Sequence, residues 1–107
     1  MNNLDPVVLA IRAAEGKKAE DVVTLNIKST SSFADYFLLA TGLNKIHTRA
    51  IADHIEEELA QNAILPFSKQ GHQEGEWILL NYLDFVVHIF VQEAREFYQL
   101  ERLWQRE

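Results

Sequence analysis

The chain has 107 residues, of which 48% are hydrophobic and 24% charged, and these proportions predict one folded domain over residues 1–107. It contains no cysteine, which excludes a disulfide framework, a thiolate zinc site and a cysteine nucleophile. The formal net charge of -6 disfavours nonspecific binding to nucleic acid and would attract a basic protein surface. Neither a signal-peptide pattern nor a membrane-spanning apolar segment is recognisable, so we expect a cytoplasmic protein.

The predicted secondary structure alternates short helices and strands. In chain order the expected spans are a helix over 5–16, strands over 22–27 and 36–41, a helix over 44–62, a loop or weak edge strand over 67–76, strands over 77–82 and 85–91, and a helix over 93–104. Asp5 and Asn44 are suitable N-caps, and Pro6 is tolerated at the first helical position. This order predicts an α/β fold, a single-domain mixed β-sheet flanked by helices.

The two strands over 77–82 and 85–91 are predicted to form a hairpin that turns at Leu83 and Asp84, so their side chains can be assigned to two faces by counting outward. One face is apolar and predicted to be core: Ile78, Leu80, Tyr82, Phe85, Val87 and Ile89. The other mixes aromatic and polar side chains: Trp77, Leu79, Asn81, Val86, His88 and Phe90. Such a mixed face suits either a partner-binding surface or a covered face with a few satisfied polar groups.

The aromatic residues of the second half of the chain have two possible roles. In the last predicted helix, Phe97 and Trp104 belong to an apolar stripe and are assigned to the core. Trp77 is different, because tryptophan is enriched at interface centres and also packs well in cores, so composition leaves both roles open.

The sequence contains no recognisable catalytic or metal-binding pattern. The four histidines lack the spacing of a helical metal pair: His47, His54, His72 and His88. Ser31, Ser32, Asp35 and His88 supply the residue types of a hydrolase triad, but no nucleophile elbow frames a serine, and we interpret the serines and Asp35 as a turn before a buried strand. The four glycines form no phosphate-binding loop. We therefore expect no metal, no cofactor and no enzyme activity.

Several separate motifs stand in the order and approximate spacing of a known family. In the first half they are Ser32-Phe33-Ala34-Asp35-Tyr36-Phe37, Ala40-Thr41-Gly42 and Ala50-Ile51-Ala52-Asp53. In the second half they are Trp77-Ile78-Leu79-Leu80, Val86-Val87-His88-Ile89-Phe90 and the run from Arg95 to Trp104. On these motifs the chain resembles the ribosomal silencing factor family, also called Iojap-like, from about Asp5 to Trp104.

The resemblance implies a fold related to the nucleotidyltransferases without their catalytic machinery. It also implies a protein that binds the large ribosomal subunit through its fourteenth ribosomal protein and sterically blocks joining of the small subunit, which represses translation under nutrient limitation. Members act without a cofactor, often form homodimers when free, and need neither DNA nor a membrane. Little direct contact with RNA is expected, and the acidic charge of the chain agrees with a basic protein partner.

The mixed hairpin face and its turn are the candidate contact surface for this partner. The predicted contact residues are Trp77, Leu79, Asn81, Tyr82, Asp84 and His88. Trp77 is expected to be the desolvated anchor and Asp84 the steering charge. The chain departs from the family pattern at four positions: Gln70 replaces the usual glutamate, Asn81 an aspartate, Leu83 a glycine and Ile46 a common arginine. Leu83 bears on the geometry of the hairpin turn.

Two alternative functions compete with ribosome silencing. A divergent nucleotidyltransferase-like enzyme would use Asp35, and a nucleotide-binding titration with metal would reveal it. A homodimeric scaffold would pair through its exposed hairpin face only with itself, and a partner pull-down would distinguish it.

Overall fold

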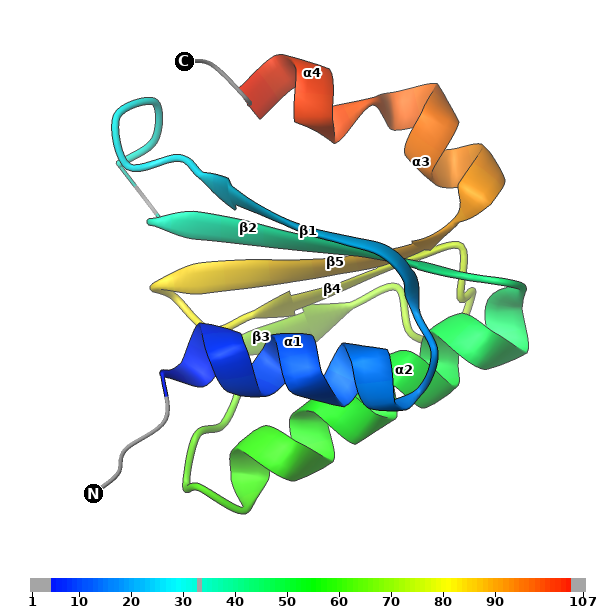
Figure 1. Ribbon diagram of the computed structural model, residues 1–107, viewed down its shortest axis with the longest axis horizontal. Coiled ribbons are helices and arrows are strands. Elements are labelled where there is room, and N and C mark those ends of the chain that lie inside the picture. The colour runs from blue at the N-terminus through cyan, green and yellow to red at the C-terminus, as the bar shows by residue number, and fades with distance from the viewer. Residues whose placement is uncertain (1–4, 33, 105–107) are drawn as a thin grey trace.

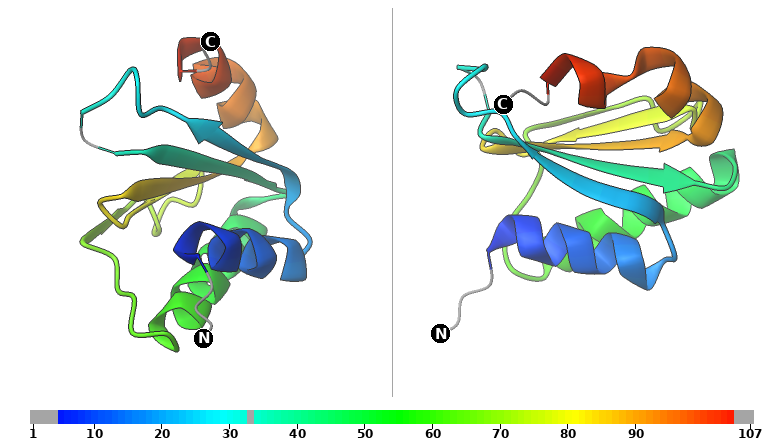
Figure 2. Two further views of the ribbon diagram at one scale, coloured as in Figure 1. Left: turned by 60° about the vertical axis from the view of Figure 1, so that its left-hand side comes forward. Right: turned by 45° about the horizontal axis from the view of Figure 1, so that its top comes forward.

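A five-stranded sheet separates two pairs of helices in the computed structural model, which describes residues 5–32 and 34–104 (Figure 1). The elements are α1 (Pro6–Gly16), β1 (Glu20–Asn26), β2 (Tyr36–Gly42), α2 (Lys45–Ala60), β3 (Ser68–Gln70), β4 (Trp77–Asn81), β5 (Phe85–Val91), α3 (Gln92–Tyr98) and α4 (Leu100–Trp104). Helices α1 and α2 lie on one side of the sheet, and α3 and α4 lie on the other, as both views of Figure 2 also show. The predicted mixed sheet flanked by helices is confirmed.

The strand order is β1-β2-β5-β4-β3, with β2 and β5 parallel at the centre and the other neighbours antiparallel. The central strands are covered on both faces, which explains why β2 reads as an almost continuous apolar run. Both edges are short or irregular. The outer strand β1 has a bulge between Glu20 and Val23, where Asp21 adopts a positive φ of 48°, and β3 at the other edge is three residues long.

Local capping sets the ends of the two long helices as predicted. The Asp5 side chain accepts a hydrogen bond from the Val7 amide at 2.9 Å, and Pro6 follows at the first helical position. The Asn44 side chain accepts one from the His47 amide at 2.8 Å and starts α2. Each cap satisfies an amide that the helix itself leaves unpaired.

Apolar side chains form one cluster on each face of the sheet. The cluster beneath α1 and α2 contains all six residues of the predicted core face, so the hairpin register counted from the turn is confirmed. The cluster beneath α3 and α4 contains Phe37, Leu39, Val86, Phe90 and Leu100. Of the two interpretations of the mixed face, the structure favours a covered face over β5, where Val86, His88 and Phe90 are all buried.

The C-terminal segment differs from the single predicted helix. Helix α3 ends at Tyr98, Gln99 adopts a left-handed φ of 50°, and a separate short helix α4 follows. Phe97 lies in the last turn of α3 and is 79% exposed, so its assignment to the core was wrong. The side chain of Trp104, which was also assigned to the core, lies outside the described residues.

A buried arginine holds this segment on the sheet. The Arg95 Nη1 atom donates to the backbone oxygen of Asp21 at 2.6 Å and to Thr41 Oγ1 at 2.7 Å. Its Nε and Nη2 atoms donate to the two carboxylate oxygens of Glu101 at 3.2 and 2.9 Å. Because Arg95 is buried, each of these bonds offsets part of the cost of removing the guanidinium from water. The arginine thereby joins α3, α4, β1 and β2.

Candidate partner-binding face

Strand β4 presents three of the predicted contact residues on the sheet face that α3 covers in part. Trp77, Leu79 and Asn81 are half-buried, whereas Ile78 and Leu80, which alternate with them, are fully buried beneath α2. Asp84 lies in the turn beyond the end of β4 and is exposed. Trp77, Leu79 and Asn81 therefore share the face that α3 covers in part, whereas Asp84 lies at the end of the hairpin away from Trp77.

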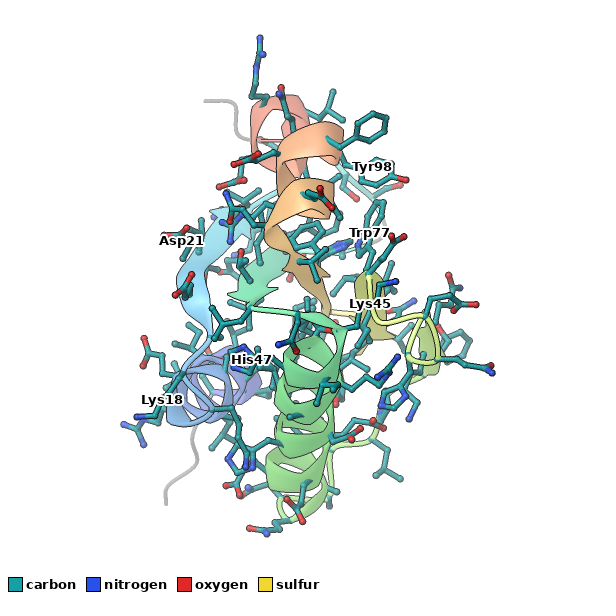
Figure 3. The ribbon with its side chains drawn as sticks, turned by 90° about the vertical axis from the view of Figure 1, so that its right-hand side faces the viewer. Lys18, Asp21, Lys45, His47, Trp77 and Tyr98 are labelled. Atoms are coloured by element: carbon teal, nitrogen blue, oxygen red, sulfur yellow. The ribbon has the colours of Figure 1, made fainter. Side chains whose placement is uncertain are left out.

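Trp77 is held by contacts on two sides. Its Nε1 atom donates a hydrogen bond to His88 Nδ1 at 3.0 Å, across the β4–β5 pair. The ring of Tyr98 lies against it with centroids 4.5 Å apart, and Figure 3 shows these two side chains together above Lys45 at the start of α2. Gly71, in the loop before β4, packs against the Trp77 backbone. A Cβ atom at Gly71 would collide with the Trp77 carbonyl oxygen. The indole thus has a fixed orientation with one side toward solvent.

His88 supports Trp77 from below and does not reach the surface. It is 4% exposed, and its ring contacts the rings of Phe37 and Phe90. Burial lowers the pKa of His88 to about 4, so the ring is neutral at physiological pH. Since indole nitrogen only donates, His88 Nδ1 is the acceptor and the proton resides on Nε2, for which the described residues supply no partner. We therefore assign His88 a positioning role, which corrects its predicted place among the contacts.

Tyr82 lies on the opposite face from the other predicted contact residues. It is 8% exposed, belongs to the cluster beneath α1 and α2, and stacks on Phe85 with centroids 5.0 Å apart. Burial raises the pKa of its hydroxyl, so the phenol stays protonated. The hairpin count already placed Tyr82 on the core face, and the structure keeps it there. Direct contact between Tyr82 and a partner docked on the Trp77 side is thus ruled out by its position.

The β4–β5 turn keeps the predicted register although a leucine replaces the usual glycine. The Tyr82 amide donates to the Phe85 oxygen at 2.9 Å, which closes the two-residue loop. Leu83 adopts a left-handed φ of 74°, and its amide donates to Asn81 Oδ1 at 2.8 Å. The Asn81 side chain therefore stabilises the turn that presents Asp84.

Helix α3 contributes surface residues that the sequence pattern did not reveal. Phe97 and Tyr98 are exposed beside Trp77, and Tyr98 remains 46% exposed while it contacts the indole. Their rings meet edge to face with centroids 5.0 Å apart. The helical spacing of apolar residues assigned Phe97 to the core because it assumed an uninterrupted helix. The Trp77 face, which we define as Trp77, Leu79, Phe97 and Tyr98, is therefore larger than expected and crosses from β4 to α3.

The described residues contain no cluster of metal-binding side chains, and Asp35 and His88 lie in different surroundings. They contain no group of three or more histidine or acidic side chains placed to hold a metal ion. Asp35 is exposed at the start of β2, whereas His88 is buried against Trp77, so the residue types of a triad are not brought together. Within the same residues, no helix has the length and apolarity needed to cross a membrane.

The sequence and the fold of the chain match known proteins. A sequence model of the family described as ribosomal silencing factor during starvation matches residues 2–107. The chain belongs to the ribosomal silencing factor family. A silencing factor from Halalkalibacterium halodurans is 36% identical over 104 residues, which cover 97% of this chain and 89% of that protein.

Other members of the ribosomal silencing factor family, and proteins related to it, agree with the assignment. A crystal structure from Chromobacterium violaceum superposes with a TM-score of 0.93 at 29% identity, covering all of this chain and 89% of that one. A mouse protein named for mitochondrial assembly of the ribosomal large subunit is 24% identical over 95% of this chain and 45% of its own length. The name silencing factor describes a regulatory role for these relatives, and it agrees with the expectation that members of the family regulate ribosomes.

Proposed function

We propose that this protein binds the large ribosomal subunit through its fourteenth ribosomal protein and blocks joining of the small subunit by occupying the shared surface. Its effect is to repress translation when nutrients are limiting. The mechanism is steric, so it needs no substrate, cofactor or metal. The proposal places the protein in the cytoplasm, where it meets free large subunits.

The observation that carries the proposal is the Trp77 face on a chain of this family. A rigid half-exposed indole beside exposed aromatic rings is the kind of anchor that dominates binding energy at protein interfaces. The hydrogen bond from Trp77 to His88 fixes the indole before binding, so less side-chain entropy is lost when a partner docks. Trp77 and Leu79 are the proposed central contacts.

The negative net charge of the chain favours a partner with a basic surface. The net charge is -6, and Asp84 is exposed in the β4–β5 turn, at the end of the hairpin away from Trp77. Complementary charge accelerates association and fixes orientation more than it raises affinity. Asp84 is the proposed steering charge, and Asn81 contributes by holding the turn through its bond to Leu83.

The direct test is sedimentation of the protein with purified large subunits, followed by addition of small subunits. We expect co-sedimentation with large subunits and a lower yield of joined ribosomes. Failure to co-sediment at micromolar concentrations would contradict the proposal. The nucleotidyltransferase alternative predicts instead a metal-dependent heat of nucleotide binding, and the scaffold alternative predicts dimers that ignore ribosomal subunits.

Two variants test the contact residues. Trp77→Ala is expected to weaken binding by about 2 kcal/mol or more, as truncation of a central anchor does, with an unchanged circular dichroism spectrum. Asp84→Lys is expected to lower the association rate at low salt. Its matched control is Glu15→Lys, which makes the same charge change on exposed α1 across the sheet. Equal association rates for the two lysine variants would remove Asp84 from the interface.

A further inference from the structure

We propose that a hollow beside Trp77 receives an arginine side chain from the basic partner. The inference rests on the proposed function in one respect, since that function supplies the partner. The hollow has a volume of about 370 Å³ and is lined by Glu76, Val91, Glu93, Ala94, Phe97 and Tyr98. This volume lies at the lower end of the range for ligand pockets, which suits one long side chain better than a cofactor.

The aromatic walls of the hollow are uncovered. Phe97 is 79% exposed, and Tyr98 is exposed on the side that does not touch Trp77. Because the two rings meet at 88°, they present differently oriented π surfaces to one occupant. Val91 and Ala94, both partly exposed, supply the apolar part of the lining. Large exposed rings around an apolar lining favour an occupant that covers them.

The two carboxylates of the hollow are unpaired within the described part of the chain. Neither Glu76 nor Glu93 forms an ion pair or side-chain hydrogen bond there, although both are exposed at the rim. Glu56 and Glu101, in contrast, are paired with Lys69 and Arg95. The hollow therefore combines two carboxylates that form no ion pair with uncovered aromatic surface.

An arginine matches this combination better than other side chains. Its planar guanidinium can stack on an aromatic ring while its N–H groups donate to a carboxylate. Its methylene groups can lie along Val91 and Ala94. A lysine offers a compact charge that is more strongly hydrated, and a neutral side chain of the same shape offers no attraction to Glu76 and Glu93.

A peptide titration tests the hollow without the ribosome. The probe is acetyl-Gly-Arg-Gly-amide, added to the isotopically labelled protein and followed by amide chemical shifts, with citrulline replacing arginine in a matched peptide. We expect saturable shifts confined to residues 76 and 91–98 and at least about tenfold weaker binding of the citrulline peptide, because that peptide lacks the charge. Absence of saturable shifts, shifts centred elsewhere, or equal binding of both peptides would overturn the inference.

Matched variants localise the binding. Phe97→Ala is expected to weaken binding of the arginine peptide about fivefold. Leu103→Ala, which removes another exposed apolar side chain, is expected to leave that affinity unchanged. Glu93→Gln is expected to weaken binding of the same peptide about threefold. Glu96→Gln, which changes a residue of the same helix outside the hollow, is expected to leave the affinity unchanged. Equal effects within either pair would refute the assignment.

Subunit sedimentation separates this inference from the proposed function. If the wild-type protein binds large subunits and Phe97→Ala and Glu93→Gln bind equally well, the arginine site is wrong and the proposed function stands. If the arginine peptide binds in the hollow but the protein ignores large subunits, the site stands and the proposed function fails.

Discussion

Replacing His88 by glutamine removes a buried titrating ring and leaves an acceptor for the Trp77 indole. Burial lowers the pKa of His88 from 6.5 to about 4 in the folded protein. Between pH 6.5 and pH 4, His88 is therefore protonated in the unfolded chain and neutral in the folded protein. The unfolded state is therefore favoured as the pH falls through 6.5, and the loss levels off near pH 4. Each pH unit inside this window costs about 1.4 kcal/mol.

The expected magnitude follows from the same two pKa values. Between pH 8 and pH 5, titration of His88 lowers the free energy of unfolding by about 2 kcal/mol, and the His88→Gln variant lacks this contribution. Urea unfolding followed by circular dichroism at both pH values measures it. The carboxylates common to both proteins cancel when the two pH dependences are subtracted. Parallel curves for wild type and variant would show that His88 titrates normally and would refute its description as a neutral support for Trp77.

Three further substitutions test the contacts that hold the candidate face. Arg95→Met should lower the free energy of unfolding by about 2–3 kcal/mol, because Thr41 and Glu101 lose their charged donor, and amide hydrogen exchange should accelerate in α4. Leu83→Gly should raise the urea midpoint by the equivalent of about 0.5–1 kcal/mol, since it relieves a left-handed φ at a side chain that is 53% exposed. Asn44→Ala should lower the free energy of unfolding by about 1 kcal/mol, because it removes the N-cap of α2, and an unchanged thermal midpoint would contradict that role.

Local signals in the sequence located most of the fold. The cap at Asp5 and the glycine at position 16 bound α1 where expected, and the two-residue turn fixed the register of β4 against β5. Helix α2 ends at Ala60, slightly before the predicted limit at Asn62. These features depend on neighbouring residues, so periodicity and turn chemistry suffice to predict them.

The candidate site was only partly predictable because its geometry depends on distant contacts. Arg95 holds the C-terminal helices through bonds to Asp21 and Thr41, which are 74 and 54 residues away in the chain. The helix break at Gln99 uses a left-handed conformation without a glycine, so no local signal marked it. The sequence therefore predicted one continuous helix with Phe97 in its apolar stripe. The sequence left both roles of Trp77 open, and its hydrogen bond to His88 could be seen only in the structure.

The two edges of the sheet restrict how copies of this chain can meet. A strand added beside β1 would encounter the distorted backbone at Asp21, whose carbonyl oxygen is already bonded to Arg95. A strand added at the opposite edge would find only the three residues of β3. Lateral growth into an extended intermolecular sheet is thereby discouraged, and self-association is directed to the faces. A copy that docked on the Trp77 face would compete with any partner for the same indole.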